Sequence, residues 1–132
     1  MQMEQTPHKA AAPVLEPVMR ERRASAKFVS REQIAACVSF RDAVCLAWDN
    51  RAVRGMTQRT CAELLDVPPS HMSNMLNRQA VDRHGKARQD LPARLVAGFQ
   101  RVVGNDVVSQ WLTRDAQLTL LEEMLQRQQE TP

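Results

Sequence analysis

The sequence predicts an all-α fold, on the evidence of its composition and of the spacing of its apolar residues. Ala, Leu, Arg, Gln and Met dominate the chain and favour helices, and apolar residues recur at intervals of three and four in several stretches. Only 4% of the residues are aromatic, none is Tyr and four are Gly, whereas a β-sandwich draws heavily on these types. A chain of 132 residues is about one domain. We therefore expect five to six helices around one core.

Residues 1–29 are expected to form a flexible arm before the first helix. They combine three Pro, small residues and a basic cluster, without any sustained apolar period. The cluster consists of Arg20, Arg22, Arg23 and Lys27. Such an arm could lie along a DNA groove, or it could be a solvated tail, and the sequence leaves both open.

The first helix is expected to begin after Ser30, because "SREQ" has the pattern of a capping box. In that motif the Ser side chain accepts the N–H of Gln33, and the Gln33 side chain accepts the N–H of Ser30. Ser39 and Phe40 could divide the following stretch into two helices, and the sequence does not decide between one and two. Its helically spaced apolar residues predict one stripe toward the core: Ile34, Cys37, Val38, Val44, Cys45 and Trp48.

Two short amphipathic segments come next, and only a tight turn separates them. Thr57 is a good N-cap for the first segment. Asp66 tolerates the left-handed conformation that such a turn requires, and Val67 can then enter the core. The first segment is expected to bury Cys61, Ala62, Leu64 and Leu65.

The second segment combines an apolar face with a polar outer face. Pro68 and Pro69 suit the first turn of a helix, where their missing N–H groups cost nothing. Helical spacing turns Met72, Met75 and Leu76 inward. The same spacing turns outward Pro69, Ser70, His71, Ser73, Asn74 and Asn77. A helix buried in a core would not carry this polar set, so we expect the outer face to bind something outside the protein.

The stretch "GMTQRTCAELLDVPPSHMSNMLN", residues 55–77, resembles the helix-turn-helix of the lambda-repressor-like (XRE/Cro-type) regulators of phages and bacteria. The features that match in register are Gln58, Ala62, Val67, Met72 and the closing Leu76 and Asn77. The chain departs from the family pattern at Asp66, where Gly is usual. It also departs at Pro68 and Pro69, where base-reading side chains are common, so base contacts are expected to shift to later residues.

The resemblance implies a lambda-repressor-like DNA-binding domain over residues 30–112, with its motif at about 57–77. The second motif helix, about residues 68–77, would enter the major groove while the first crosses the backbone. Gln58 would contact phosphate or brace the second helix, Asn74 is chemically suited to adenine, and His71 is suited to a guanine acceptor or a phosphate. With the basic loop after the motif, the predicted DNA-binding residues are Gln58, Arg59, Pro69, Ser70, His71, Ser73, Asn74, Asn77, Arg78, Arg83, Lys86 and Arg88.

The charge distribution favours the same part of the chain. The net charge is +3 overall and the pI is about 9.1. Residues 51–90 carry seven basic and four acidic side chains, so they hold an excess of +3 by themselves. Phosphate contacts need clustered Lys and Arg, so this excess points to the middle of the chain as a nucleic-acid-binding surface.

The last third is also expected to be helical. A helix should start on Pro92 and end at Gly104, and Asn105 should cap a short helix after it. Its inward residues are expected to be Leu95, Val96, Phe99, Val102 and Val103. A last helix, roughly 115–128 within a C-terminal element of residues 113–132, carries a stripe of Leu118, Leu120, Leu121, Met124 and Leu125. This stripe either mediates homodimerisation, as a palindromic operator would require, or completes the core, and the sequence leaves both open.

Other functions find little support in the sequence. Three widely spaced cysteines form no disulfide framework or CxxC motif, and no apolar run is long enough for a membrane span, so a cytoplasmic protein is expected. No catalytic motif is present, and we predict no catalytic residue, cofactor or metal ion. We interpret the chain as a sequence-specific regulator of phage or prophage type that binds double-stranded DNA, in the simplest case a repressor. The alternative is an antitoxin or adaptor whose C-terminal helices bind a protein partner.

Overall fold

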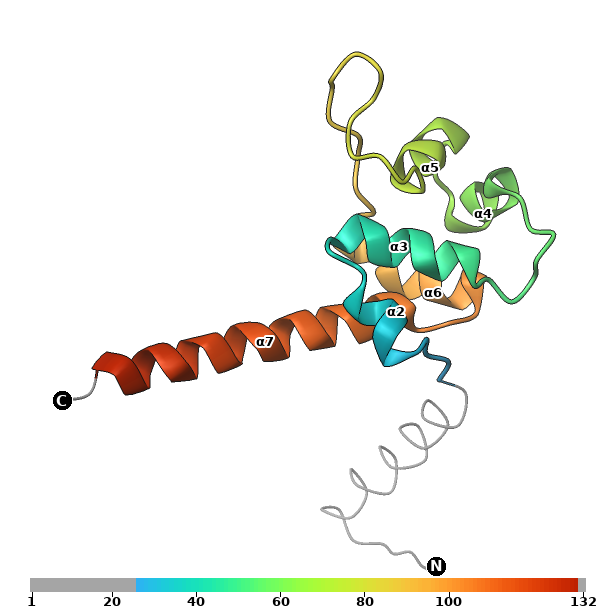
Figure 1. Cartoon of the computed structure of the whole chain (residues 1–132). Helices are drawn as coiled ribbons and strands as arrows, with labels where there is room; N and C mark the ends of the chain where they lie inside the picture. Colours follow the sequence, from blue (N-terminus) through green and yellow to red (C-terminus); the bar gives the residue numbers. More distant parts are fainter. Residues whose placement is uncertain (1–25, 131–132) are drawn as a thin grey trace, which may run out of the picture.

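The computed structural model describes residues 26–130, so most of the predicted arm lies outside the described residues. Within this range the chain forms six α-helices, one short 3₁₀ helix and no strand, which confirms the all-α fold class (Figure 1). The elements are α2 (Arg31–Ala35), α3 (Phe40–Asp49), α4 (Gln58–Leu65), α5 (Pro69–Met75), η1 (Ala93–Leu95), α6 (Val96–Val103) and α7 (Val107–Glu130).

Residues 30–50 form two helices, which settles the question that the sequence left open. The capping box at Ser30 and Gln33 is confirmed, and a second one starts α3, where the Ser39 side chain accepts the N–H of Asp42 at 3.2 Å. The prediction that Val38 faces the core is wrong, because Val38 lies between the two helices and is 88% exposed.

The core lies where α3, α4, α5 and α6 meet the beginning of α7. Asn105 joins two of these elements: its side chain accepts the N–H of Val107 at 3.3 Å and donates to the carbonyls of Ala47 and Asn50 at 3.0 and 3.2 Å. The predicted cap is therefore present, and it also holds the start of α7 against the end of α3. The largest fully buried side chains are Phe99, Met72, Met75, Val44, Val103, Val107, Val108 and Cys61.

The turn between α4 and α5 has the predicted backbone. Thr57 caps α4 by accepting the N–H of Thr60 at 3.1 Å, and Asp66 adopts the left-handed conformation with φ 57° and ψ 47°. Pro68 is the N-cap of α5, and Pro69 is its first residue. The expectation that Leu64 is buried is wrong: it is 62% exposed, since it lies beyond the edge of the narrow buried face of this eight-residue helix.

Helix α6 is shorter at its start than expected, because residues 93–95 form the 3₁₀ helix η1 after Pro92. Its end is as predicted, with Gly104 in the left-handed region at φ 78°. Glycine is needed here for a second reason, because a Cβ at this position would lie 2.8 Å from the Cβ of Ala52. The close approach goes with a 2.7 Å hydrogen bond from the N–H of Ala52 to the carbonyl of Val103.

The C-terminal part forms one continuous helix of 24 residues, and not the two expected helices. Residues 113–115 contain neither Gly nor Pro, so nothing local stops α7 there. The expected domain boundary after residue 112 therefore falls inside α7, and Figure 1 shows this long helix projecting away from the other helices. Its leucine stripe does not complete the core in this structure. No helix within residues 26–130 has the length and apolarity to cross a membrane.

Candidate nucleic-acid interface

Helix α5 presents the predicted polar face. Met72 and Met75 are 0% and 1% exposed and anchor one side of the helix in the core. This anchoring leaves Ser70, His71 and Ser73 exposed on the other side. Pro69 is also exposed, whereas Asn74 and Asn77 are half-buried. The helix is seven residues long, so the exposed polar side chains lie within two turns of one another.

Asn74 is already hydrogen-bonded within the protein. Its side-chain nitrogen donates to the carbonyl of Ser70 at 3.2 Å, and its side-chain oxygen accepts from Arg88 at 3.0 Å. Each engaged atom keeps one further hydrogen or lone pair, so a bidentate contact to adenine remains chemically possible. The two bonds fix the orientation of the amide before any ligand arrives.

A residue that the sequence reasoning missed, Arg41 of α3, positions this site. Its side chain is 5% exposed, and its guanidinium donates to the carbonyls of Asn74 and Asn77 at 2.7 and 2.8 Å. It also donates to the carbonyl of Gln89 at 2.9 Å and to the carboxylate of Asp90 at 3.0 Å. Arg41 thus gives the carbonyls of Asn74 and Asn77 a charged donor at the end of α5, and it ties this end to residues 89–90. The available sequence signal was a single Arg within an apolar helix face.

The basic loop, residues 78–90, is confirmed as a non-helical segment and has its own internal order. Two backbone hydrogen bonds of 2.8 Å join the two sides of the loop. The N–H of Arg88 donates to the carbonyl of Ala80, and the N–H of Asp82 donates to the carbonyl of Lys86. The Asp82 carboxylate accepts the N–H groups of Lys86 and His84 at 2.9 and 2.8 Å, and these bonds lower the pKa of that carboxyl. Figure 1 shows the loop, in yellow, projecting beside α5.

The predicted phosphate-binding cations fall into two groups. Arg83 and Lys86 are exposed near the tip of the basic loop and form no ion pair with any described residue. Arg78 is paired with Asp49 of α3, and this contact raises the pKa of Arg78. The Nε atom of Arg59 lies 3.9 Å from the Oε2 atom of Glu63 on the same helix. The structure therefore leaves the loop tip as the more available cationic surface.

The remaining predicted contact, Gln58, is the first residue of α4. It is half-buried, and its side chain forms no hydrogen bond to any described residue. Its amide can therefore turn toward an external acceptor or toward α5.

The pKa of each of the three cysteines is raised in this fold, chiefly by burial. Burial raises the pKa of Cys61 to about 11, and it also raises the pKa of Cys45. Both thiols are therefore protonated near neutral pH. Within residues 26–130, no group of three or more His, Cys, Asp or Glu is placed to hold a metal ion.

Scans against protein-family models, curated proteins and solved structures found no match to this chain. Its function has to be argued from its own residues.

Proposed function

We propose that the chain is a sequence-specific regulator that binds double-stranded DNA, of the lambda-repressor-like helix-turn-helix type. Helix α5 would enter the major groove while α4 crosses the sugar-phosphate backbone. The observation that carries the proposal is the α4–turn–α5 unit. A left-handed Asp66 joins two short helices, and the second is anchored by buried methionines and exposes a row of small polar side chains.

The surroundings of this unit support the same function. Helices α2 and α3 precede the unit and α6 and α7 follow it, so α4 and α5 are the third and fourth of the six α-helices within residues 26–130. The basic loop carries four basic and two acidic side chains, so it adds a net charge of +2 beside α5, where the sugar-phosphate backbone would lie. Arg41 holds the end of α5 and the base of this loop together, so one rigid surface would meet the DNA.

Recognition would proceed through side chains more than through backbone N–H groups. Pro68 and Pro69 have no N–H, so the first turn of α5 offers few backbone donors to phosphate. His71 is suited to a guanine acceptor or a phosphate, and Asn74 to adenine. Arg83 and Lys86 would contact phosphates and contribute equally on every sequence.

Selection from a randomised duplex library at roughly physiological salt tests the proposal, because weak electrostatic binding is suppressed there. The expected result is enrichment of an inverted repeat, with half-site centres separated by about 34 Å or a multiple of it. A folded protein that enriches no sequence would contradict it.

One observation favours the second candidate, an adaptor or antitoxin that binds a protein partner. The apolar side chains on the outer part of α7 are uncovered, and a partner chain could cover them. The composition of the native particle separates the two candidates. A homodimeric regulator contains this chain alone, whereas an adaptor or antitoxin complex contains a second polypeptide.

A further inference from the structure

The outer part of α7 carries a line of apolar side chains that nothing in the described chain covers. The start of the helix is anchored: Val107 and Val108 are fully buried, and the indole of Trp111 donates to the carbonyl of Cys37 at 3.0 Å. Farther out, Leu118, Leu121 and Leu125 are 44%, 51% and 51% exposed. Their spacing of three and four puts them on one face of the helix, so they form a continuous leucine line. An apolar line of this kind marks an association surface.

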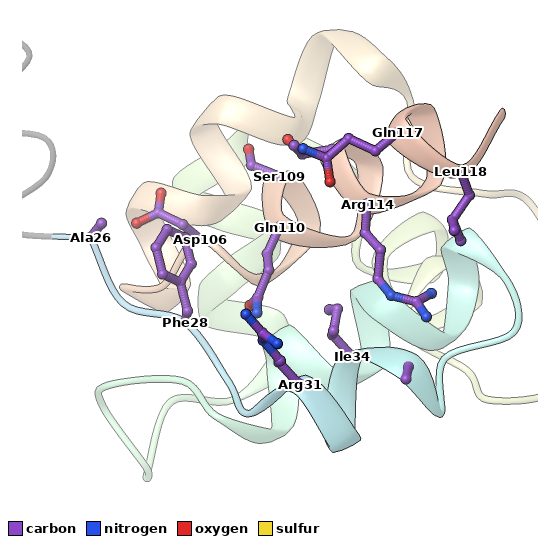
Figure 2. A pocket seen from close by; sticks show the side chains of 12 residues that line it. Ala26, Phe28, Arg31, Ile34, Asp106, Ser109, Gln110, Arg114, Gln117 and Leu118 are labelled. Carbon is purple, nitrogen blue, oxygen red and sulfur yellow. The ribbon is translucent and has the colours of Figure 1, made fainter. Parts of the chain in front are cut away.

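A groove of about 830 Å³ lies at the base of the leucine line, between residues 26–35 and α7 (Figure 2). One wall includes Phe28 and Ile34, and the other includes Gln110 and Leu118. Phe28 is 63% exposed although its backbone segment is pinned, since the Gln110 side chain bonds both the N–H and the carbonyl of Val29, at 3.1 and 3.0 Å. Leu118 belongs to both the groove and the leucine line, so the two form one surface.

The groove and the outer half of α7 carry net charges of opposite sign. Arg31 and Arg114 line the groove and have no ion-pair partner among the described residues. The third charged group there, Asp106, is engaged by the backbone N–H of Lys27 at 3.2 Å. The outer half of α7, residues 119–130, has three Glu and one Arg, a net charge of −2. With Asp106 counted, the charged side chains that line the groove have a net charge of +1, opposite in sign to the exposed end of the same helix.

We propose that this surface receives the α7 helix of a second copy of the chain, in antiparallel orientation. The groove runs beside residues 106–118. In a parallel pair the groove would face residues 106–118 of the partner. Val107 and Val108 in that stretch are buried in the core of their own chain and could not fill the groove. In an antiparallel pair it faces residues 118–130, which are exposed throughout.

Charge complementarity supports the same direction. A parallel pair would place like charges of the two helices at the same height, whereas an antiparallel pair brings the acidic half of one copy to the basic groove of the other. If the two helices cross near Leu118, Glu122 of each copy lies opposite Arg114 of the other. The partner's Leu121 and Leu125 then reach toward the groove and cover the apolar surface. This inference concerns self-association and does not rest on the proposed DNA binding.

Sedimentation of the full chain without DNA tests whether the leucine line mediates a homodimer. The wild type should be a dimer at about 100 μM, and Leu121→Glu should raise the dissociation constant at least tenfold. The matched control is Leu120→Glu, which changes a neighbouring leucine of 61% exposure on a different face and should leave the dimer intact. A monomeric wild type, or equal behaviour of the two variants, would overturn the proposal. Circular dichroism of each variant checks that the fold is retained.

Exchanging the charges of Arg114 and Glu122 tests whether the two α7 helices are antiparallel. Arg114→Glu and Glu122→Arg should each weaken the dimer, and the double variant should recover most of the lost affinity, since the two side chains meet across an antiparallel pair. In a parallel pair the two positions lie about 12 Å apart along the axis. A double variant no stronger than the single ones would therefore sink the antiparallel arrangement.

Discussion

Helix α5 and the outer half of α7 are both exposed, and they differ in what holds them and in what they expose. Two methionines and the guanidinium of Arg41 fix α5, and its open face is polar. The outer half of α7 is fixed by no packing within the described chain, and its open face is apolar. A rigid polar face suits the reading of base edges, where geometry decides specificity. An unsupported apolar face suits association, where buried area provides the stability.

The largest expected difference between the two regions is in packing. Met72→Ala should lower the free energy of unfolding by about 2–5 kcal/mol, because it opens a cavity under α5. Leu120→Ala on α7 should change it by less than about 0.5 kcal/mol, because that side chain lies on the surface. Urea denaturation followed by circular dichroism measures both. Comparable losses would show that α7 is held by contacts of its own.

Removing Arg41 should have the next largest effect. Arg41→Ala removes the buried donor that the carbonyls of Asn74, Asn77 and Gln89 share, and it should destabilise the protein by about 2–4 kcal/mol. Arg41→Lys keeps the charge but cannot span the separated acceptors, so it should restore only part of the stability. A lysine variant as stable as the wild type would show that charge alone matters at this position. Affinity for a selected DNA site should fall in both variants, because α5 and the basic loop lose their connection.

The sequence predicted those parts of this fold that depend on near neighbours. The caps at Ser30 and Thr57, the left-handed Asp66 and the buried methionines of α5 all follow from residues within a few positions of one another. The role of Arg41 could not be predicted in this way, since its acceptors are 33 to 49 residues away in the chain.

The errors have the same origin. Val38 and Leu64 fit a helical period, but whether a position on such a stripe is covered depends on distant elements, and here nothing covers them. The pattern of α7 left open whether its leucines meet the core or a partner. The DNA-binding roles of the twelve predicted residues remain predictions, although the structure shows that Asn74, Arg78 and Arg88 already have protein partners.

Two substitutions in the proposed interface should separate base reading from phosphate binding. His71→Ala should lose about 1–3 kcal/mol on the selected site and change little on random DNA. Arg83→Ala should weaken both about equally and reduce the slope of log affinity against log salt by about 0.9. Titrations at several salt concentrations give both quantities. If His71→Ala left the site preference untouched, α5 would not be the recognition helix.

The smallest expected effect concerns the Asp82 carboxylate in the basic loop. Hydrogen bonds from the N–H groups of Lys86 and His84 lower the pKa of Asp82 in the folded protein below its ordinary value of 3.8. Folding of the loop therefore favours the charged carboxylate. The charged form stabilises the folded loop at pH values above the ordinary pKa of Asp82. The contribution should be lost as the pH falls through the lowered folded-state pKa.

Hydrogen exchange of the Lys86 and His84 amides, measured between about pH 2 and pH 6 and corrected for the intrinsic rate, tests this link. In the wild type their protection should fall at the acidic end of that range. In Asp82→Asn, which keeps an acceptor oxygen but cannot titrate, protection should be lower at pH 6 and should not change with pH. If the wild type and this variant behaved alike, the order of the loop would come from its backbone hydrogen bonds alone. The loop tip would then keep its position beside α5 at any charge of Asp82, and the carboxylate would have no part in presenting Arg83 and Lys86 to DNA.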